Sequence, residues 1–220
     1  MLASIGIITF DQGLAYAFVA IGVYLSFRVL DFPDLTVDGS FPMGAAIAAI
    51  IIAGGGNPFL ATFAGLGGGL GAGIVTGLLN TKLKINPLLS GILSMIALYS
   101  INLMIMGKSM VSLLHIDTVF DKIANLFALE ATSVLTIVAL AILVIIVLLI
   151  LTWFLHTQTG LAIRATGDNE QMIRGLGVDT DKTKLIGLSL SNGLEDLSGE
   201  LVAQDGGFAP VGMGIGMIII

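Results

Sequence analysis

The sequence predicts an all-α, polytopic membrane protein with about six transmembrane helices, and three observations lead to this fold class. Of its 220 residues, 56% are hydrophobic and only 11% are charged, whereas soluble domains carry about 25% charged residues. The apolar residues fall into runs that approach the ~20 residues needed to cross a bilayer. The 29 glycines gather inside these runs, as they do in helices that pack closely in membranes.

Four of the expected spans are regular, and the whole chain, 1–220, reads as one membrane domain. The first span covers 7–30 and is a retained helix, because neither a basic stretch nor a cleavage site marks it as a signal peptide. The third and fourth spans, 59–79 and 87–106, are separated by a short polar turn. The fifth, 132–155, contains no charged residue and is the clearest of all.

The second span, 34–53, is unusual because its apolar part, 41–53, has only 13 residues. It can cross the membrane only if the preceding segment lies partly at membrane depth, as a broken helix that lines a translocation pathway. The competing interpretation is an ordinary cytoplasmic loop in which Ser40 caps the helix. On the first interpretation, Thr36, Asp38 and Ser40 are candidate pathway residues.

The sixth span, 185–203, is the least regular because it carries Glu195, Asp196 and Glu200. Each acidic side chain in mid-bilayer costs roughly 2.5–3.5 kcal/mol. These acids therefore face a wet pathway, mark a segment that does not insert as drawn, or reflect altered sequence. The last apolar stretch, 211–220, is too short to cross, and we expect the C-terminal part of the natural protein to be missing from this chain.

The basic residues predict an orientation. If the polar loop 156–184 is cytoplasmic, alternation of the spans places the N-terminus outside. Seven of the nine basic residues then lie inside and two outside, in agreement with the positive-inside rule. The inner residues are Arg28, Lys82, Lys84, Arg164, Arg174, Lys182 and Lys184, and the outer residues are Lys108 and Lys122.

The third span carries glycine at every fourth position, at Gly65, Gly69, Gly73 and Gly77. This spacing lets another helix backbone approach closely. We expect the partner to be a helix of the same chain, with dimerisation through this face as the minority alternative. The run 67–72 also matches a dinucleotide-binding fingerprint, but no strand–helix unit surrounds it, and we reject that interpretation.

The loop 156–184 predicts a short amphipathic helix near its centre. Asp168 or Asn169 can cap its N-terminus. Glu170 then lies in the first turn, where the helix dipole favours a negative charge, and Gly175 and Gly177 can stop the helix. Such a helix lies on the membrane surface or docks a cytosolic partner.

Several classes of protein are excluded by what the sequence lacks. The absence of cysteine excludes disulfides and thiolate metal sites. His115 and His156 lie at opposite ends of the fifth span, so we expect no metal site. No basic patch with interleaved aromatic residues is present, which argues against nucleic-acid binding. Without a G-x-x-x-x-G-K-[ST] motif, we expect no ATP hydrolysis by this chain and no cofactor.

Three stretches carry a resemblance to a known family. The segment 160–178 resembles the cytoplasmic coupling segment of ABC importer permeases of the branched-chain amino acid and ribose type. The segments 34–40 and 88–107 look like one subgroup of that family, which is encoded with a binding lipoprotein and often assigned to tryptophan or tyrosine. The resemblance extends over nearly the whole chain.

The resemblance implies a subunit of a prokaryotic plasma-membrane importer that forms the pathway for a small solute, an amino acid in this subgroup. Cytosolic ATPase subunits would dock on the loop and use the ATP, an extracytoplasmic lipoprotein would deliver the substrate, and a second copy or close homologue would pair with the chain in the lipid bilayer. Further helices would follow position 220. Both arginines of the loop would offer donors to the ATPase. The residues assigned to coupling are Arg164, Asp168, Asn169, Glu170 and Arg174.

Two other classes remain as alternatives. A secondary active transporter should show inverted repeats with paired broken helices, and the only counterpart to 34–40 lies near 206–216. An intramembrane enzyme needs a convergent polar set, but the three acids of the sixth span lack a histidine or serine partner at matching depth. Neither class explains the loop motif.

Overall fold

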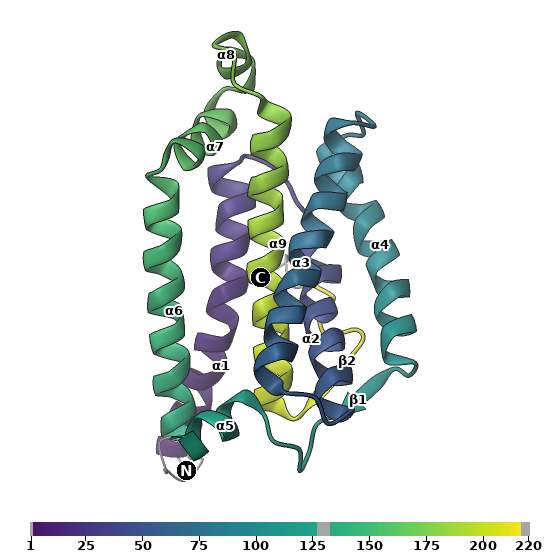
Figure 1. Ribbon diagram of the computed structural model, residues 1–220, viewed down its shortest axis with the longest axis vertical. Coiled ribbons are helices and arrows are strands. Elements are labelled where there is room, and N and C mark those ends of the chain that lie inside the picture. Colours follow the sequence, from purple (N-terminus) through teal and green to yellow (C-terminus); the bar gives the residue numbers. More distant parts are fainter. Residues whose placement is uncertain (1, 127–132, 217–220) are drawn as a thin grey trace.

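The computed structural model describes residues 2–126 and 133–216, which are helical almost throughout (Figure 1). This confirms the all-α fold class. The elements are α1 (Leu2–Val23), the π-helix η1 (Tyr24–Val29), α2 (Val37–Ala53), α3 (Pro58–Thr81), α4 (Pro87–Met106), β1 (Met110–Ser112), α5 (Val119–Leu126), α6 (Ser133–Leu155), α7 (Gln158–Asp168), α8 (Glu170–Gly175), α9 (Thr180–Gly206) and β2 (Phe208–Pro210). Residue 132, the expected start of the fifth span, lies outside the described residues.

Four stretches of the described chain are long and apolar enough to cross a membrane, namely Gly6–Val29, Pro58–Thr81, Pro87–Met106 and Val134–Leu155. Two further helices lie alongside them. The apolar helix α2 has only 17 residues, and α9 has 27 but carries the three acids. The predicted bundle of about six helices therefore consists of four regular spans and two irregular ones, with α9 in contact with α1, α2 and α3.

The helix ends follow local signals in the sequence. The side chains of Asn57 and Asn86 cap α3 and α4 by accepting hydrogen bonds from the second backbone N–H that follows, and a proline occupies the first position of each helix. Proline suits that position because its missing N–H would have no partner in the helix. Gly107 ends α4 with φ 63°, in the left-handed region that glycine adopts without strain.

The second span is broken, as the fold-class prediction required. After η1, Asp31 has φ 52°, and residues 31–35 have no helical structure. The segment is nonetheless inside the protein, since Phe32 and Asp34 are 2% and 1% exposed. The helix α2 starts at Val37, after Thr36. Ser40 thus lies within the helix, and the alternative in which it is the cap is wrong.

The sixth span is longer than the predicted 185–203, because α9 starts earlier, at Thr180. The side chain of Asp179 accepts a hydrogen bond from the backbone N–H of Lys182 and fixes this start. The three acids of α9 point into the bundle and not toward lipid. Glu195 is 1% exposed, and Asp196 and Glu200 are 0% exposed.

The glycine ladder of α3 packs within the chain against α9. A Cβ added at Gly73 would meet the backbone of Leu188, and one at Gly69 would meet the carbonyl oxygen of Asn192. The helices therefore approach to backbone contact, which only glycine permits. Gly71, on another face of α3, has nothing within 4 Å of an added Cβ.

The end of the molecule opposite α7 and α8 is closed by a short ribbon. The strands β1 and β2 pair antiparallel, with Val111 opposite Ala209. Beyond β2, residues 211–216 form turns, and Gly214 lies against the carbonyl of Asp38 at the start of α2. The rest of the predicted last segment, 217–220, lies outside the described residues.

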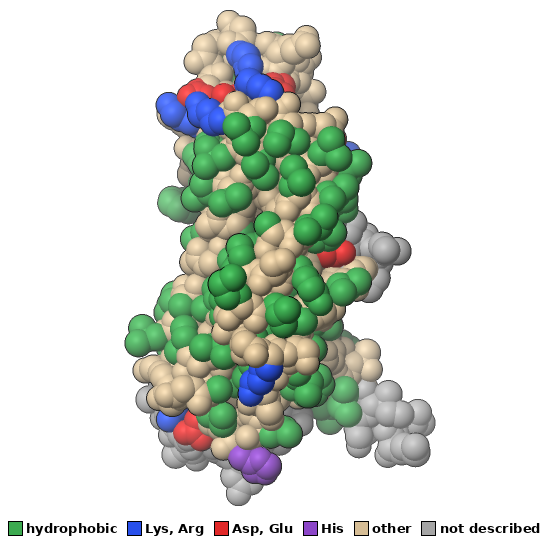
Figure 2. Space-filling view, turned by 90° about the vertical axis from the view of Figure 1, so that its right-hand side faces the viewer, with side chains coloured by type: hydrophobic (Ala, Val, Ile, Leu, Met, Phe, Trp, Pro, Cys, Tyr) green, Lys and Arg blue, Asp and Glu red, His purple; other side chains and the backbone are tan. Residues whose placement is uncertain are grey.

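The charges are arranged as a membrane protein requires. Hydrophobic side chains cover the middle of the molecule, and lysine and arginine side chains gather at its upper end (Figure 2). That end carries η1, the α3–α4 turn, α7, α8 and the start of α9 (Figure 1), where the seven inner basic residues lie. The chain is thus a multi-pass membrane protein, and its orientation stays a prediction.

Candidate functional site

The helix α7 is fixed at the upper end of the bundle by a small hydrophobic cluster. Ile163 is fully buried and packs with Leu30, Phe32 and Leu188. Gly167 lies directly on the carbonyl of Val29, where a Cβ would clash. The segment that includes α7, α8 and the start of α9, residues 158–184, is called the coupling segment below. Its base therefore rests on the end of the first span.

The predicted short helix is confirmed as α8, and its N-cap is Asn169, one of the two candidates. The Asn169 side chain accepts a hydrogen bond of 2.9 Å from the N–H of Met172. Gly175 is the last residue of α8, and Gly177, two positions later, has φ 89°, the left-handed backbone that ends a helix. Ile173 is buried, whereas Met172 and Leu176 are 55% and 73% exposed. The tip of α8 therefore presents two apolar side chains to the outside.

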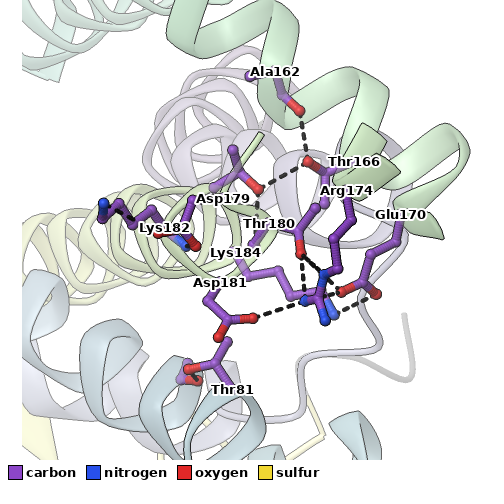
Figure 3. A network of polar contacts seen from close by, with 12 residues as sticks. Thr81, Ala162, Thr166, Glu170, Arg174, Asp179, Thr180, Asp181, Lys182 and Lys184 are labelled. Atoms are coloured by element: carbon purple, nitrogen blue, oxygen red, sulfur yellow. Dashed lines mark hydrogen bonds and ion pairs between the residues drawn. The ribbon is translucent and has the colours of Figure 1, made fainter. Parts of the chain in front are cut away.

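Glu170 is the centre of an ionic network that joins α8 to α9 (Figure 3). Its Oε2 accepts a hydrogen bond of 2.7 Å from Lys184 Nζ. Its Oε1 accepts from Arg174 Nη2 at 3.1 Å and from Thr180 Oγ1 at 3.2 Å. Arg174 Nη2 also lies 2.9 Å from Asp181 Oδ1. One carboxylate thus holds two helices together through two cations.

The network shifts the pKa of Glu170. Partial burial opposes ionisation of the carboxyl group, but the hydrogen bond and charge of Lys184 outweigh it and hold the pKa of Glu170 below its ordinary value. At the helix start, hydrogen bonds from the side chain and backbone of Lys182 lower the pKa of the exposed Asp179. Both carboxyl groups are therefore ionised at neutral pH.

A pair of threonines adds a direct link between α7 and α9. Thr166 Oγ1 lies 2.8 Å from Thr183 Oγ1, and Thr183 also donates to the carbonyl of Thr180. Thr166 and Thr183 are 3% and 5% exposed. The coupling segment is consequently joined to α9 by both hydroxyl and ionic contacts.

The structure brings together three of the five residues assigned to coupling, Asn169, Glu170 and Arg174. Asp168 and Arg164 lie on α7 and take no part in this network among the described residues. Two nitrogen atoms of Arg174, Nε and Nη2, donate to groups of the same chain, whereas we expected this side chain to serve a partner.

Sequence reasoning missed the residues at the start of α9, namely Thr180, Asp181 and Lys184. One signal was present, because Glu170 and Arg174 are spaced i, i+4 and pair on a helix. The residues of α9 become neighbours only when the turn after α8 reverses the chain.

A second polar network surrounds the broken helix. Thr36 Oγ1 lies 2.9 Å from Thr76 Oγ1, which donates to Ser94 Oγ at 2.7 Å. Asn192 Nδ2 of α9 donates to Asp34 Oδ2 at 2.7 Å. Three helices, α3, α4 and α9, thus bind the non-helical segment, which satisfies polar groups that lipid could not.

The candidate pathway residues lie next to the acids of α9. Ser40 donates to Glu195 Oε2 at 3.0 Å, and Ser191 donates to Oε1 at 3.0 Å. The view that these acids lack a serine partner is therefore wrong for Glu195. Asp38 Oδ2 accepts from the N–H of Gly216 at 3.1 Å. Thr36 and Ser40 are 0% exposed, so they hold helices together here and do not face an open channel.

Two acids of α9 are different from Glu195. Within the described residues, no carboxylate oxygen of Asp196 or Glu200 has a hydrogen-bond partner. No group of three or more metal-ligating side chains occurs among the described residues either. Among the residues that the structure describes, the polar contacts around the broken helix link helices to one another.

A bundle of membrane-length helices with a small helical segment at one end defines a multi-pass membrane protein but not its activity. The chain belongs to the family described as the permease component of the branched-chain amino acid transport system, which it matches over residues 7–220. No solved structure matches the chain.

Individual relatives agree with the family. The chain is 43% identical over 209 residues to the tyrosine transport system permease protein of Clostridioides difficile (strain R20291), covering 95% of this chain and 68% of that protein. It is 36% identical to the uncharacterized protein RP368 of Rickettsia prowazekii (strain Madrid E), covering 96% and 71%. Over 95 residues, 43% of this chain and 27% of the relative, it is 35% identical to the autoinducer 2 import system permease protein LsrC of Salmonella typhimurium.

The family decides between the classes left open by the sequence. The chain is a permease subunit of an ABC transporter, a non-catalytic membrane component. The predicted resemblance is confirmed, and the alternatives of a secondary transporter and an intramembrane enzyme are set aside.

Proposed function

We propose that this chain forms the translocation pathway for an amino acid in an importer of the prokaryotic plasma membrane. Separate cytosolic ATPase subunits hydrolyse the ATP, an extracytoplasmic lipoprotein delivers the substrate, and a second copy of the chain or a close homologue completes the pathway. The family description and the relative named for tyrosine transport support an amino acid, and an aromatic one in particular.

The observation that carries this proposal is the connection of the coupling segment to α9. An ATPase that displaces α8 displaces Glu170, which holds Lys184 and, through Arg174, Asp181. Further along the same helix, Asn192 and Glu195 contact the broken second span. Because a packed helix can move as a rigid body, α9 carries a motion of α8 to the non-helical segment before α2.

The contact with the ATPase is made by the tip of α8. Met172 and Leu176 are exposed apolar side chains on a helix fixed from behind by the buried Ile173, and rigid apolar anchors contribute most of the affinity of protein interfaces. Arg164 and Asp168 flank this tip on α7 and supply the polar rim.

A test removes the apolar tip. We expect Met172→Glu combined with Leu176→Glu to reduce co-purification of the ATPase by about tenfold or more, since each anchor contributes on the order of 1 kcal/mol or more. The control is Leu114→Glu, a residue 62% exposed at the opposite end of the molecule. Unchanged ATPase recovery and uptake with the double variant would show that α8 is not the docking helix.

The substrate is tested separately in cells that contain the complete transport system. We expect uptake of labelled tyrosine, with competition by excess unlabelled tryptophan. Deletion of the permease must abolish this uptake. If the deletion leaves tyrosine uptake unchanged and no other amino acid depends on the permease, the proposed substrate class is wrong.

A further inference from the structure

A cavity of about 250 Å³ lies beside the coupling segment, between the α3–α4 turn and the facing surfaces of α8 and α9. Its charged lining consists of Lys84, Arg174 and Lys184 with Glu170 and Asp181. The transport function proposed above uses the far side of α8 and leaves this cavity unassigned.

The cavity has a net positive lining. Glu170 is paired with Arg174 and Lys184, and Asp181 is paired with Arg174. Lys84 forms no ion pair within the part of the chain that the structure describes. It is exposed on the α3–α4 turn, where its φ of 57° holds the backbone in a tight reversal. One cationic side chain is therefore available to an anion, beside two more whose charges are already shared.

The cavity lies at the edge of the apolar surface. It adjoins the last turn of α3 and the first residue of α4, both membrane-spanning helices. Leu83 on the turn is 66% exposed, and Leu88 and Leu89 in the first turn of α4 are 43% and 53% exposed. The basic side chains at the upper end lie directly above the belt of hydrophobic side chains (Figure 2). This is the depth at which lipid headgroups meet a membrane protein.

We propose that this cavity binds the phosphate group of an anionic phospholipid. Basic pockets between helices at the cytoplasmic surface attract such headgroups, and Lys84 and Arg174 offer hydrogen-bond donors to phosphate oxygens. The exposed leucines of the turn and of the start of α4 would lie beside the acyl chains. This site goes beyond the transport function and does not depend on it.

Occupation of the site has a structural consequence for the coupling segment. Arg174 and Lys184 line the cavity and also hold Glu170 in the network between α8 and α9. A phosphate group here competes with Glu170 and Asp181 for the same donors. The lipid therefore binds at the residues that fix α8 to α9.

The test is a lipid titration followed by native mass spectrometry, with the full-length permease extracted together with its partner subunits. Phosphatidylglycerol is the probe and phosphatidylcholine the zwitterionic comparison. We expect Lys84→Gln to lower the affinity for phosphatidylglycerol about fivefold, the effect of one lysine near an anionic surface, and Lys84→Arg to retain it. Lys108→Gln, an identical change at the other end of the molecule, leaves it unchanged.

Two outcomes overturn the proposal. Equal binding of phosphatidylglycerol by the parent and Lys84→Gln proteins excludes Lys84 as part of a lipid site. If inorganic phosphate raises the thermal stability of the parent but not of Lys84→Gln, while phosphatidylglycerol binds no better than phosphatidylcholine, the cavity takes free phosphate and the lipid assignment is wrong. Folding of each variant is checked by its helical circular dichroism.

Discussion

Glu170 shows how one residue determines the pH response of the coupling segment. Its pKa lies below the ordinary value of 4.5, so its contribution to stability is present above about pH 4.5 and is lost as the pH falls through the lower pKa of the folded state. Because 36% of the side chain is exposed, solvent screens the pairs, and the contribution is about 0.5–1 kcal/mol.

We therefore expect Glu170→Gln to lower the thermal midpoint at pH 7 but not at a pH below the lowered pKa of the folded state, where the parent carboxyl group is itself protonated. Thermal unfolding in detergent, followed by circular dichroism at both pH values, measures this difference. Asp117→Asn is the matched control, since it removes an exposed ion pair with Lys122. A loss of equal size at both pH values would contradict the assigned role of the charge.

Asn192 and Asp34 are a second residue-scale pair, separated by 158 positions in the sequence. Replacing Asn192 by Leu leaves a buried carboxyl oxygen without its donor, and we expect a loss of about 1–3 kcal/mol in the free energy of unfolding. In the double variant with Asp34→Leu, we expect a loss smaller than the sum of the two single losses, because both partners of this bond are absent, although Thr36 N–H also loses its acceptor, Asp34 Oδ1. Chemical unfolding of the two single variants and the double variant forms the required cycle, and strictly additive losses would show that the two side chains do not interact.

These residues also show what sequence reasoning can reach. Asn169 and Glu170 were predictable because capping and first-turn charges act over three or four positions. The Asn192–Asp34 hydrogen bond was not, because nothing local distinguishes an asparagine that serves a distant carboxylate from one that packs against its own helix. The inward direction of Glu195 was equally hidden, since it depends on which faces of α9 meet α1, α2 and α3.

At the scale of elements, the contact between α3 and α9 gives a direct test of the glycine ladder. Gly73→Ala adds a Cβ against the backbone of Leu188, which cannot move aside as a side chain would. We expect a loss of about 1–3 kcal/mol, as for overpacked cores. Gly71→Ala on the same helix meets nothing and should be neutral or slightly stabilising. Thermal unfolding of the two variants measures this difference in stability. Equal midpoints would mean that α3 and α9 do not approach each other as described.

The elements were predictable to different degrees for physical reasons. Helices α3 and α4 follow from apolar runs bounded by Asn-Pro and polar residues, so their ends agree closely with the expected spans 59–79 and 87–106. The start of α9 was misplaced because its first turn is polar and resembles loop. The strands β1 and β2 have three residues each, which is too short for an alternating pattern of polar and apolar residues to reveal them. We find no sequence pattern in 24–29 that predicts the π-helix η1.

For the whole molecule, orientation can be measured with introduced cysteines, because the 220 residues of this chain contain none of their own. Single cysteines at positions Lys82 and Lys108 lie at opposite ends of the bundle. We expect Lys108→Cys to react with a membrane-impermeant maleimide in intact cells, and Lys82→Cys to react only after permeabilisation. The reverse labelling pattern would mean that the orientation is the opposite one. The coupling segment would then lie outside the cell, where no cytosolic ATPase could reach it.

The ribbon of β1 and β2 has a consequence for how such a subunit can move. At 1.5 Å per residue, α9 is about 40 Å long, and its far end continues into β2, which is hydrogen-bonded to β1 just after α4. We expect a displacement of α9 at the coupling segment to be carried along this helix to β2 and, through its pairing with β1, to the end of α4. On this expectation, the two ends of the subunit change position together and not one by one.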